Sequence, residues 1–218
     1  MITIHTISIG QPQAHSDAEG AYRSSIFRLP VSGPVALGPR GLQDDQVTDT
    51  VHHGSPGQAV CCHALEHHAY WNQVYGLEGT PQAFAPGCLG ENWTLANGLE
   101  SEVCVGDVFA VGTAQVQVSG TRYPCHKQDR RMNLPDLSRR AMQTLRTGFY
   151  LAVLQPGVVQ AGDALALLRR PHPDLTLQAL NRCAFETPDP VLIERFLQAA
   201  ELAESWKKLL RQRLPQPE

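Results

Sequence analysis

The sequence lacks the features that mark several large classes of protein. No apolar run approaches the roughly 20 residues that a membrane-spanning helix needs. The amino-terminal segment has no basic region followed by a long apolar stretch, as a secretory signal would. At a net charge of −3 the chain also has no strongly basic stretch, which argues against binding to nucleic acid. We therefore expect a cytoplasmic protein with neither a membrane nor a nucleic acid as partner.

Cysteine is present but is not arranged for cross-links or clusters. The 6 cysteines include no C-x-x-C pair, so the spacing does not fit a zinc site or an iron–sulfur cluster. A disulfide framework is not expected in a cytosolic chain of this size. Cys104, in an apolar run, and Cys183, on a predicted helix, are predicted to be small buried residues. The sequence also lacks the G-x-G-x-x-G pattern of a dinucleotide-binding fold.

What the chain does contain is a pattern of many short strands. Its 218 residues, 42% hydrophobic and 18% charged, suffice for a real core. Strand-like runs alternate with short turns that contain Gly, Pro and Asp, which is typical of a barrel or a strongly bent sheet. We therefore predict a mainly β fold with α insertions, with strands at 2–9, 26–32, 58–62, 107–111, 114–119, 149–154 and 163–168.

Helical periodicity appears in two insertions and then takes over the last part of the chain. One insertion is predicted at 64–75, with Leu65, Trp71 and Val74 facing inward. The other starts at an Asp136 cap and ends before Gly148. Beyond a Pro-rich linker, three short helices follow at 176–185, 190–200 and 203–214. The predicted organisation is a β-barrel domain over 1–170 and a small three-helix domain over 171–218.

The segment Gly120–Lys127 carries the strongest chemical signal. Cys125 lies between Arg122 and Lys127, and nearby positive charge lowers a thiol's pKa and favours the thiolate, which binds metals and attacks electrophiles. Pro124 restricts the backbone on both sides, so the cysteine is presented from a stiff turn. The alternative is a buried cysteine with two incidental basic neighbours.

Two weaker constellations stand elsewhere in the chain. His53 and Gly54 lie in a Gly-rich turn whose N–H groups can approach an anion, although a plain turn with exposed histidines is the alternative. Glu91 and Asn92 follow Gly90, and such a polar pair can recognise the edge of a heterocycle.

A competing signal is the H-x-x-E-H string formed by His63, Glu66 and His67 on the first predicted helix. This spacing is the inverted zinc-peptidase signature. No clear third carboxylate ligand follows it, so packing or surface histidines are the favoured interpretation.

Taken in order, these motifs resemble the MOSC domain family, the domain found at the carboxyl end of molybdenum cofactor sulfurases. The helical tail, with Ser205, Trp206 and an Arg-Gln-Arg-Leu run, is similar to the YiiM-like branch. The resemblance covers nearly the whole chain. The segments that carry it are Gly41-Leu42-x-x-Asp45, His53-Gly54-x-Pro56, Gly90-Glu91-Asn92, Val105-Gly106-Asp107 and Val118-Ser119-x-x-Arg122-x-Pro124-Cys125-x-Lys127.

The resemblance implies a β-barrel that binds a molybdopterin-type molybdenum cofactor, with Cys125 as the metal ligand and the catalytic residue. Arg122, Lys127, His53, Gly54, Glu91 and Asn92 would then bind the cofactor. The implied activity is reduction of N-hydroxylated compounds, such as N-hydroxylated purine base analogues, with electrons from a separate flavin or iron–sulfur reductase. Family-level descriptions add pyridoxal phosphate binding and detoxification, and a homodimer is a further expectation.

The chain departs from the family pattern at three positions. Asp44 replaces a glycine, Ser55 replaces the second glycine after His53, and Thr121 stands where a proline often precedes the arginine. Three other classes also remain open. These are a sulfur carrier with a persulfide on Cys125, a zinc hydrolase, and a non-catalytic binding module.

Overall fold

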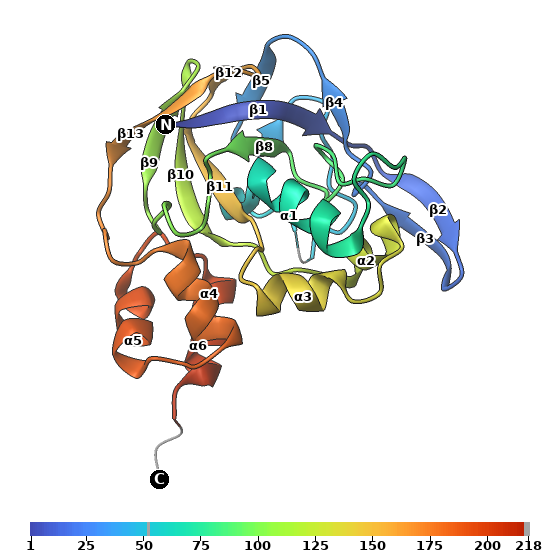
Figure 1. Ribbon diagram of the computed structural model, residues 1–218. Helices are drawn as coiled ribbons and strands as arrows, with labels where there is room; N and C mark the ends of the chain where they lie inside the picture. The colour runs from blue at the N-terminus through green and yellow to red at the C-terminus, as the bar shows by residue number, and fades with distance from the viewer. Residues whose placement is uncertain (52, 216–218) are drawn as a thin grey trace.

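The fold is a closed β-barrel with a bundle of helices at one end (Figure 1). A computed structural model describes residues 1–51 and 53–215. The main sheet has eight strands in the order β13-β9-β10-β11-β7-β8-β1-β4, and pairing of β13 with β1 closes all but β4 into a ring. These strands are β1 (Ile2–Ile9), β4 (Leu29–Val31), β7 (Val60–Ala64), β8 (Trp93–Ala96), β9 (Val108–Val111), β10 (Ala114–Thr121), β11 (Phe149–Gln155) and β13 (Ala164–Arg169).

The strand alternation that predicted a barrel is confirmed by the sheet. Pairing is antiparallel except between β7 and β8, which run parallel because helix α1 (Leu65–Tyr75) connects the first of them onward. The turn at Gly112 joins β9 and β10 as the expected hairpin. In β10 the side chains of Val116 and Val118 point into the core, while Gln115 and Gln117 are less buried.

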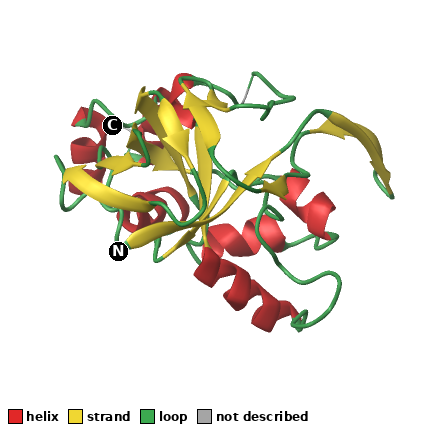
Figure 2. Ribbon diagram, turned by 90° about the horizontal axis from the view of Figure 1, so that it is seen from above, coloured by secondary structure: helices red, strands yellow, loops and turns green. Residues whose placement is uncertain are grey.

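Smaller sheets flank the barrel. One contains β5 (Val35–Gly38), β6 (Gly41–Leu42) and β12 (Gly157–Val159), and the other is a hairpin of β2 (Gln13–Asp17) and β3 (Gly20–Ser24). The hairpin extends away from the body of the molecule (Figures 1 and 2). Arg130 fastens it by pairing with Asp17 and by stacking 3.7 Å from the Tyr22 ring centroid.

Helices α4 (Leu177–Phe185), α5 (Pro190–Gln198) and α6 (Glu204–Arg213) form the predicted three-helix group. Asp189 caps α5 as expected, since its carboxylate accepts a hydrogen bond from the Leu192 N–H. Side chains of the group, such as Leu180, Phe196 and Leu210, belong to the same buried core as the barrel strands. The helices are therefore packed onto the barrel by shared apolar burial.

Three expectations about helices need correction. Val74 on α1 is 39% exposed, so of the predicted inward residues only Trp71 is fully buried. Asp136 precedes α3 (Leu137–Gln143) but makes no capping hydrogen bond, because its carboxylate pairs with Arg140 and accepts from the Tyr75 hydroxyl. A helix not foreseen, α2 (His126–Met132), begins directly after Cys125. Within the described residues no helix has both the length and the apolar character required to cross a membrane.

Candidate functional site

The strand that leads into the Cys125 turn is fastened to the neighbouring segment Thr147–Gly148. The Thr121 hydroxyl lies 2.6 Å from the Thr147 hydroxyl and donates to the Gly148 carbonyl. The Arg122 N–H donates to that same carbonyl at 2.9 Å. Cys125 itself is half-buried, has extended backbone angles and is the residue before the first turn of α2. The thiol is thus presented from a fixed position, as the proline-containing sequence predicted.

A cavity of about 460 Å³ opens beside Cys125. Four cationic side chains reach it from three parts of the chain and outnumber its two carboxylates, Asp45 and Asp49, which makes it suited to an anionic ligand. They are Arg28, Arg40, Arg122 and Lys127. Among the expected site residues, His53, Gly54, Asn92 and Cys125 also line this cavity, so the structure brings six of the seven together.

Glu91 is the expected residue that does not line the cavity. Its side chain is completely buried and its oxygens accept hydrogen bonds from the N–H groups of Gly87 and Leu89 and from the Thr94 hydroxyl. His68 Nε2 lies 3.1 Å from the same carboxylate. Burial alone would raise the pKa of Glu91, but His68 and the other donors hold that pKa below its usual range. Glu91 thus does not line the cavity as expected, and both of its carboxylate oxygens accept hydrogen bonds inside the protein.

The loop that Glu91 holds has a direct effect on the cavity. The Leu89 carbonyl accepts a 2.8 Å hydrogen bond from Arg122 Nη1, and the Gly90 carbonyl accepts a 2.6 Å bond from Arg28 Nη1. Gly90 has a φ of +77°, and a Cβ there would lie 2.6 Å from Ile26 Cγ1. The Gly-Glu-Asn string therefore shapes a loop whose carbonyl oxygens orient two arginines of the cavity.

Asn92 lies in the cavity wall with its side chain largely committed to the fold. Its Oδ1 accepts from the Cys61 N–H at 3.1 Å, and its own N–H donates to the Cys61 carbonyl at 2.7 Å. These bonds join the segment before β8 to β7. Asn92 thus positions the wall in which Cys61 lies.

Arg28 was not foreseen as a site residue, although its partner Asp45 was part of the family pattern. Arg28 Nη2 and Asp45 Oδ2 are 2.9 Å apart, and Arg28 Nε donates to Asp45 Oδ1 at 3.0 Å. This two-point pairing fixes the guanidinium at the cavity. The preceding residue, Asp44, has a φ of +65°. A glycine adopts that conformation freely and an aspartate tolerates it, so the Asp44 departure leaves the loop geometry intact.

The His53 turn supplies the outer wall of the cavity. The His53 N–H donates to the Asp49 carbonyl at 3.1 Å, and Gly54 has a φ of +79°. Lys127, on α2, reaches across to the same segment, with its Nζ 3.8 Å from Asp49 Oδ2. His52, the other histidine of this string, lies outside the described residues.

Two further cavity residues carry chemistry that the sequence did not reveal. Cys61 is buried in the wall, and burial raises the pKa of its thiol despite the opposing charges of Arg122 and Arg28. Burial likewise raises the pKa of Tyr150, which comes from β11. Cys61 was not expected in the site, because the cysteine spacing fits no metal centre. A strand position facing the Cys125 turn is visible only in the fold.

A second cavity, of about 450 Å³, adjoins the first at Cys125. It is bounded by α6 and by Tyr123 of the Cys125 turn, and its wall is mostly apolar. Cys125 lines both cavities.

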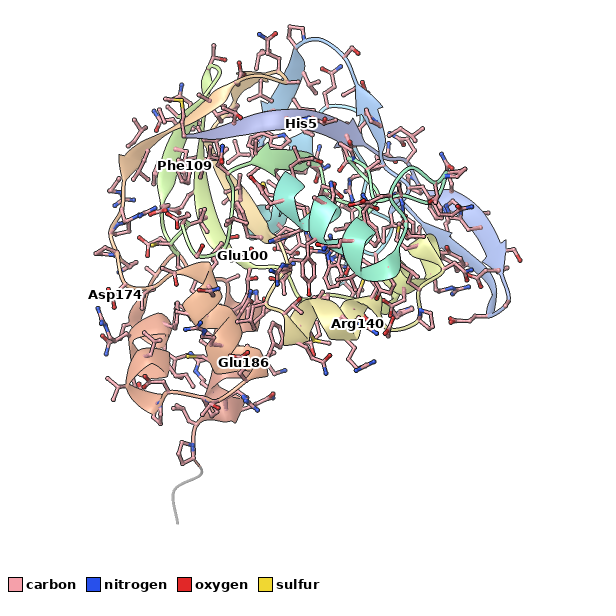
Figure 3. The ribbon with its side chains drawn as sticks, viewed as in Figure 1. His5, Glu100, Phe109, Arg140, Asp174 and Glu186 are labelled. Atoms are coloured by element: carbon pink, nitrogen blue, oxygen red, sulfur yellow. The ribbon has the colours of Figure 1, made fainter. Side chains whose placement is uncertain are left out.

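The H-x-x-E-H string does not converge on a point. His63 lies on β7 rather than on the helix, and the Glu66 carboxylate accepts from the Asn97 N–H on a separate loop. His67 Nδ1 is 3.4 Å from His63 Nδ1, while its Nε2 is 3.2 Å from Glu100 Oε2. Glu100 also accepts from the N–H groups of Thr147 and Gly148, between the barrel and helices α3 and α4 (Figure 3). The histidines are buried structural residues.

The side chains of the site also limit how a metal ion could be held there. Among the residues that the structure describes, no group of three or more His, Cys, Asp or Glu side chains could hold a metal ion. Cys125, at the edge of the first cavity, could supply one sulfur ligand to a metal that is carried by a cofactor. An organic group with anionic substituents suits the arginine-lined cavity beside it. The residues present fit a molybdenum cofactor of the molybdopterin type.

The structure thus defines a closed β-barrel protein with an arginine-lined cavity beside a half-buried cysteine. Residues 49–166 match the MOSC domain, and residues 175–216 match the YiiM-like, 3-alpha helix domain. The chain belongs to the MOSC domain family. MOSC domains are associated in general with binding of the molybdenum cofactor.

Two relatives match nearly the full chain, and a third matches three quarters of it. YflK of Bacillus subtilis is 34% identical over 94% of this chain and 91% of its own length. YiiM of Escherichia coli is 31% identical over 94% of this chain and 89% of its own length. A protein named reductase from Gibberella moniliformis is 30% identical over 75% of this chain, which spans 29% of that longer protein.

A solved crystal structure matches this fold over nearly the full length of both chains. The crystal structure of YiiM from Geobacillus stearothermophilus superposes with a TM-score of 0.80 at 32% identity. The match covers 99% of this chain and 100% of that one. Barrel and helical group therefore occur together in that protein as they do here.

Proposed function

We propose that this protein is a molybdenum-cofactor-binding oxidoreductase that reduces N-hydroxylated compounds. The observation that carries the proposal is the position of Cys125, at the edge of a cavity lined by Arg28, Arg40, Arg122 and Lys127. A sulfur ligand beside a cationic cavity suits a cofactor that combines a thiophilic metal with a phosphate. Membership of the MOSC family and similarity to a protein named reductase support the same activity.

Each group has a defined task in this proposal. Cys125 would hold the molybdenum through its sulfur. Arg28 and Arg122 would pair with the cofactor's anionic groups, because the Gly90 and Leu89 carbonyls and Asp45 already fix both guanidinium groups. Lys127 and the His53 turn would close the outer wall.

When bound, the cofactor supplies the two-electron redox chemistry, as is usual for cofactor enzymes. Reduction of an N–OH compound to the corresponding N–H compound consumes two electrons and two protons and releases water. A separate flavin or iron–sulfur reductase would deliver the electrons. The Tyr150 phenol, whose pKa is raised by burial, stays protonated at neutral pH and can donate a hydrogen bond to a polar atom in the cavity.

The test is metal and pterin analysis of protein made in a host that synthesises the cofactor. We expect about one molybdenum per chain, retained in a Cys183→Ala control and lost in Cys125→Ala. Cys183 is a suitable control because it is buried on α4 and lines neither cavity. The loaded wild-type protein should convert an N-hydroxylated substrate to its amine when given a reductant.

Other results would reject the proposal. Stoichiometric zinc that is lost in His67→Ala would indicate a hydrolase. Metal-free protein with cyanide-labile sulfur on Cys125 would indicate a sulfur carrier. Molybdenum that remains in Cys125→Ala would show that this thiol is not its ligand.

A further inference from the structure

The positive charges of the chain are concentrated in two segments that contribute to the Cys125 site. Residues 122–146, which contain α2 and α3, and residues 204–213, which form α6, hold 11 of the 18 Lys and Arg residues. The same segments hold only 3 of the 21 Asp and Glu residues. Although the net charge is −3, these two segments are strongly cationic and the rest of the chain is acidic.

Both segments contribute to the wall of the second cavity. His126 and Lys127, at the start of α2, line this cavity together with Ser205, Trp206 and Leu209 of α6. In Figure 1, α3 and α6 lie along the lower side of the molecule and α2 adjoins α3; Figure 3 places Arg140 on that side. The cationic segments therefore lie beside the cavity that adjoins Cys125.

Helix α6 presents positive charge to solvent next to this cavity. Lys208 is exposed and precedes Leu209, a residue of the cavity wall. The Arg211 side chain is 57% exposed, and its Nη1 is 3.9 Å from the Glu204 carboxylate. Glu204 is the only acidic residue of α6, and Lys207 Nζ lies 3.6 Å from it as well. One carboxylate is thus shared between two basic side chains, and a net positive charge remains on the helix.

The acidic residues of the other segment are held by groups within it. Asp136 pairs with Arg140 and lies 3.7 Å from Arg139, and Asp129 accepts hydrogen bonds from the Ser138 N–H and hydroxyl at 2.6 Å. The guanidinium groups exceed these carboxylates, so positive charge remains toward solvent here too. Four exposed residues of the two segments form what we call the cationic face: Arg139 and Arg140 on α3, and Lys208 and Arg211 on α6.

An electron donor is the partner that this position would serve. Under the proposed function, electrons must reach a metal held by Cys125, which is half-buried and lines the second cavity. Reduction of the N–OH group takes two electrons and two protons and releases water. A fully reduced flavin gives up two electrons and two protons when it is oxidised, so one flavin balances one turnover. Electron-transfer contacts between proteins are small and transient, and opposite charge steers them.

We propose that the cationic face is the docking surface for an acidic flavin protein that supplies these electrons. The three-helix group is then a docking element, and its charge raises the rate of encounter. The redox role of the partner rests on the proposed function, whereas the binding of an acidic protein to this face does not. A nucleic acid is a poorer fit, because the net negative charge of the rest of the chain would repel its phosphates.

The experiment uses flavodoxin, an acidic protein that carries one FMN, as the probe. Its binding to protein purified from a cofactor-competent host is measured by calorimetry at about 20 mM and about 200 mM salt, with molybdenum determined on the same sample. Wild type is expected to bind saturably at low salt and about tenfold more weakly at high salt. Reduced flavodoxin should also support turnover of benzamidoxime, an N-hydroxylated compound, with the same dependence on salt.

Charge reversal on α6 assigns the binding to this face. The double variant Lys208→Glu with Arg211→Glu is expected to weaken flavodoxin binding, and to lower kcat/KM for reduced flavodoxin, by about tenfold. Turnover driven by dithionite, which needs no docking surface, should be unchanged. Arg23→Glu is the matched control, because Arg23 is exposed on the β2–β3 hairpin, away from α6, and lines neither cavity.

A second double variant, Lys208→Gln with Arg211→Gln, removes the charge without placing new carboxylates beside Glu204. It should show a smaller loss of binding in the same direction, about threefold. Thermal unfolding of each variant checks that α6 remains folded.

Absence of saturable binding, binding that does not depend on salt, or equal effects of Arg23→Glu and the α6 reversal would overturn the inference. Tighter binding of a DNA oligonucleotide than of flavodoxin would also overturn it and assign the face to nucleic acid. Its failure is separable from that of the proposed function. Molybdenum-free protein that binds flavodoxin through α6 supports the docking surface and rejects the reductase. Molybdenum-loaded protein that turns over with dithionite but does not respond to the α6 charges rejects the docking surface alone.

Discussion

Trp206 on α6 and Thr121 at the end of β10 are joined by a 2.7 Å hydrogen bond from the indole Nε1 to the backbone carbonyl. Nearby, the Ala203 N–H donates to the Ser119 carbonyl at 2.9 Å. The strand that leads into the Cys125 turn is therefore held by the three-helix group as well as by its neighbours in the barrel. Stability of the helices and geometry of the cysteine turn are consequently coupled.

Trp206→Phe tests this coupling. The variant keeps most of the apolar contact but leaves the Thr121 carbonyl without its indole partner, which should lower the free energy of unfolding by about 1–2 kcal/mol. Urea unfolding measures the loss, and molybdenum content should fall in parallel. Trp206→Ala also opens a cavity and should cost about 3–5 kcal/mol. A Trp206→Phe protein as stable as wild type would contradict the role given to the hydrogen bond.

Gly120→Ala should disturb the same contact from the barrel side. Gly120 has a φ of +145°, and a Cβ there would lie 2.9 Å from Trp206 Cδ1 and 3.3 Å from Leu202 Cδ1. We expect a loss of about 2–3 kcal/mol from backbone strain and displacement of α6 together. Gly20→Ala is the control, because its φ of +106° is also strained but nothing lies within 4 Å. Thermal unfolding of both proteins separates the contact from the backbone effect, and equal losses would rule the contact out.

Glu100→Gln should loosen the segment behind the Cys125 turn. The Glu100 carboxylate accepts from the Thr147 and Gly148 N–H groups and lies 3.2 Å from His67 Nε2. Burial by itself would raise the pKa of Glu100, but His67 and the Gly148 N–H hold it below the usual range. An amide keeps the shape and loses the charge, so a cost of about 2–3 kcal/mol is expected in urea unfolding. Glu66→Gln, which affects one exposed bond to Asn97, should change stability by less than about 0.5 kcal/mol.

Acid should destabilise the protein from below pH 6.5, and His63 should account for the first part of the loss. Burial and the adjacent His67 lower the pKa of His63 well below its reference value of 6.5. Between pH 6.5 and about 5, unfolded His63 binds a proton that folded His63 does not, so the free energy of unfolding falls as pH falls. The slope from one such proton is at most about 1.4 kcal/mol per pH unit.

His63→Asn should flatten this slope between pH 6.5 and 5, whatever its effect at pH 8. Guanidinium unfolding at several pH values makes the comparison. Below pH 4.5 both proteins should lose further stability, since the pKa values of Glu91 and Glu100 are also depressed in the folded state. Identical slopes in the two proteins would contradict the assignment to His63.

The barrel could be predicted because its strands alternate between core and surface, as Val116 and Val118 do in β10. The β2–β3 hairpin could not, because both faces of Gln13–Asp17 are largely exposed and the segment has no apolar alternation. Helix α2 was also unexpected. Its sequence, HKQDRRM, has no apolar stripe, and only Gln128 is buried.

In the site, Cys125, Arg122 and Lys127 were identified because they are neighbours in the chain. Arg28 was missed because nothing local marks it, and its role follows from pairing with Asp45 and with the Gly90 carbonyl. Glu91 was expected to bind the cofactor because the Gly90-Glu91-Asn92 string is one of the segments that carry the family resemblance. Only the fold shows that its carboxylate accepts hydrogen bonds from the backbone N–H groups of Gly87 and Leu89.

The order of the elements along the chain has a consequence for biosynthesis. The arginine-lined cavity is built from segments that all precede β13, whereas the face formed by Trp206 and Leu209 belongs to α6, at Glu204–Arg213. During translation the barrel strands leave the ribosome before this last wall does. A nascent chain therefore lacks the α6 side chains that line the second cavity until this last helix has been made.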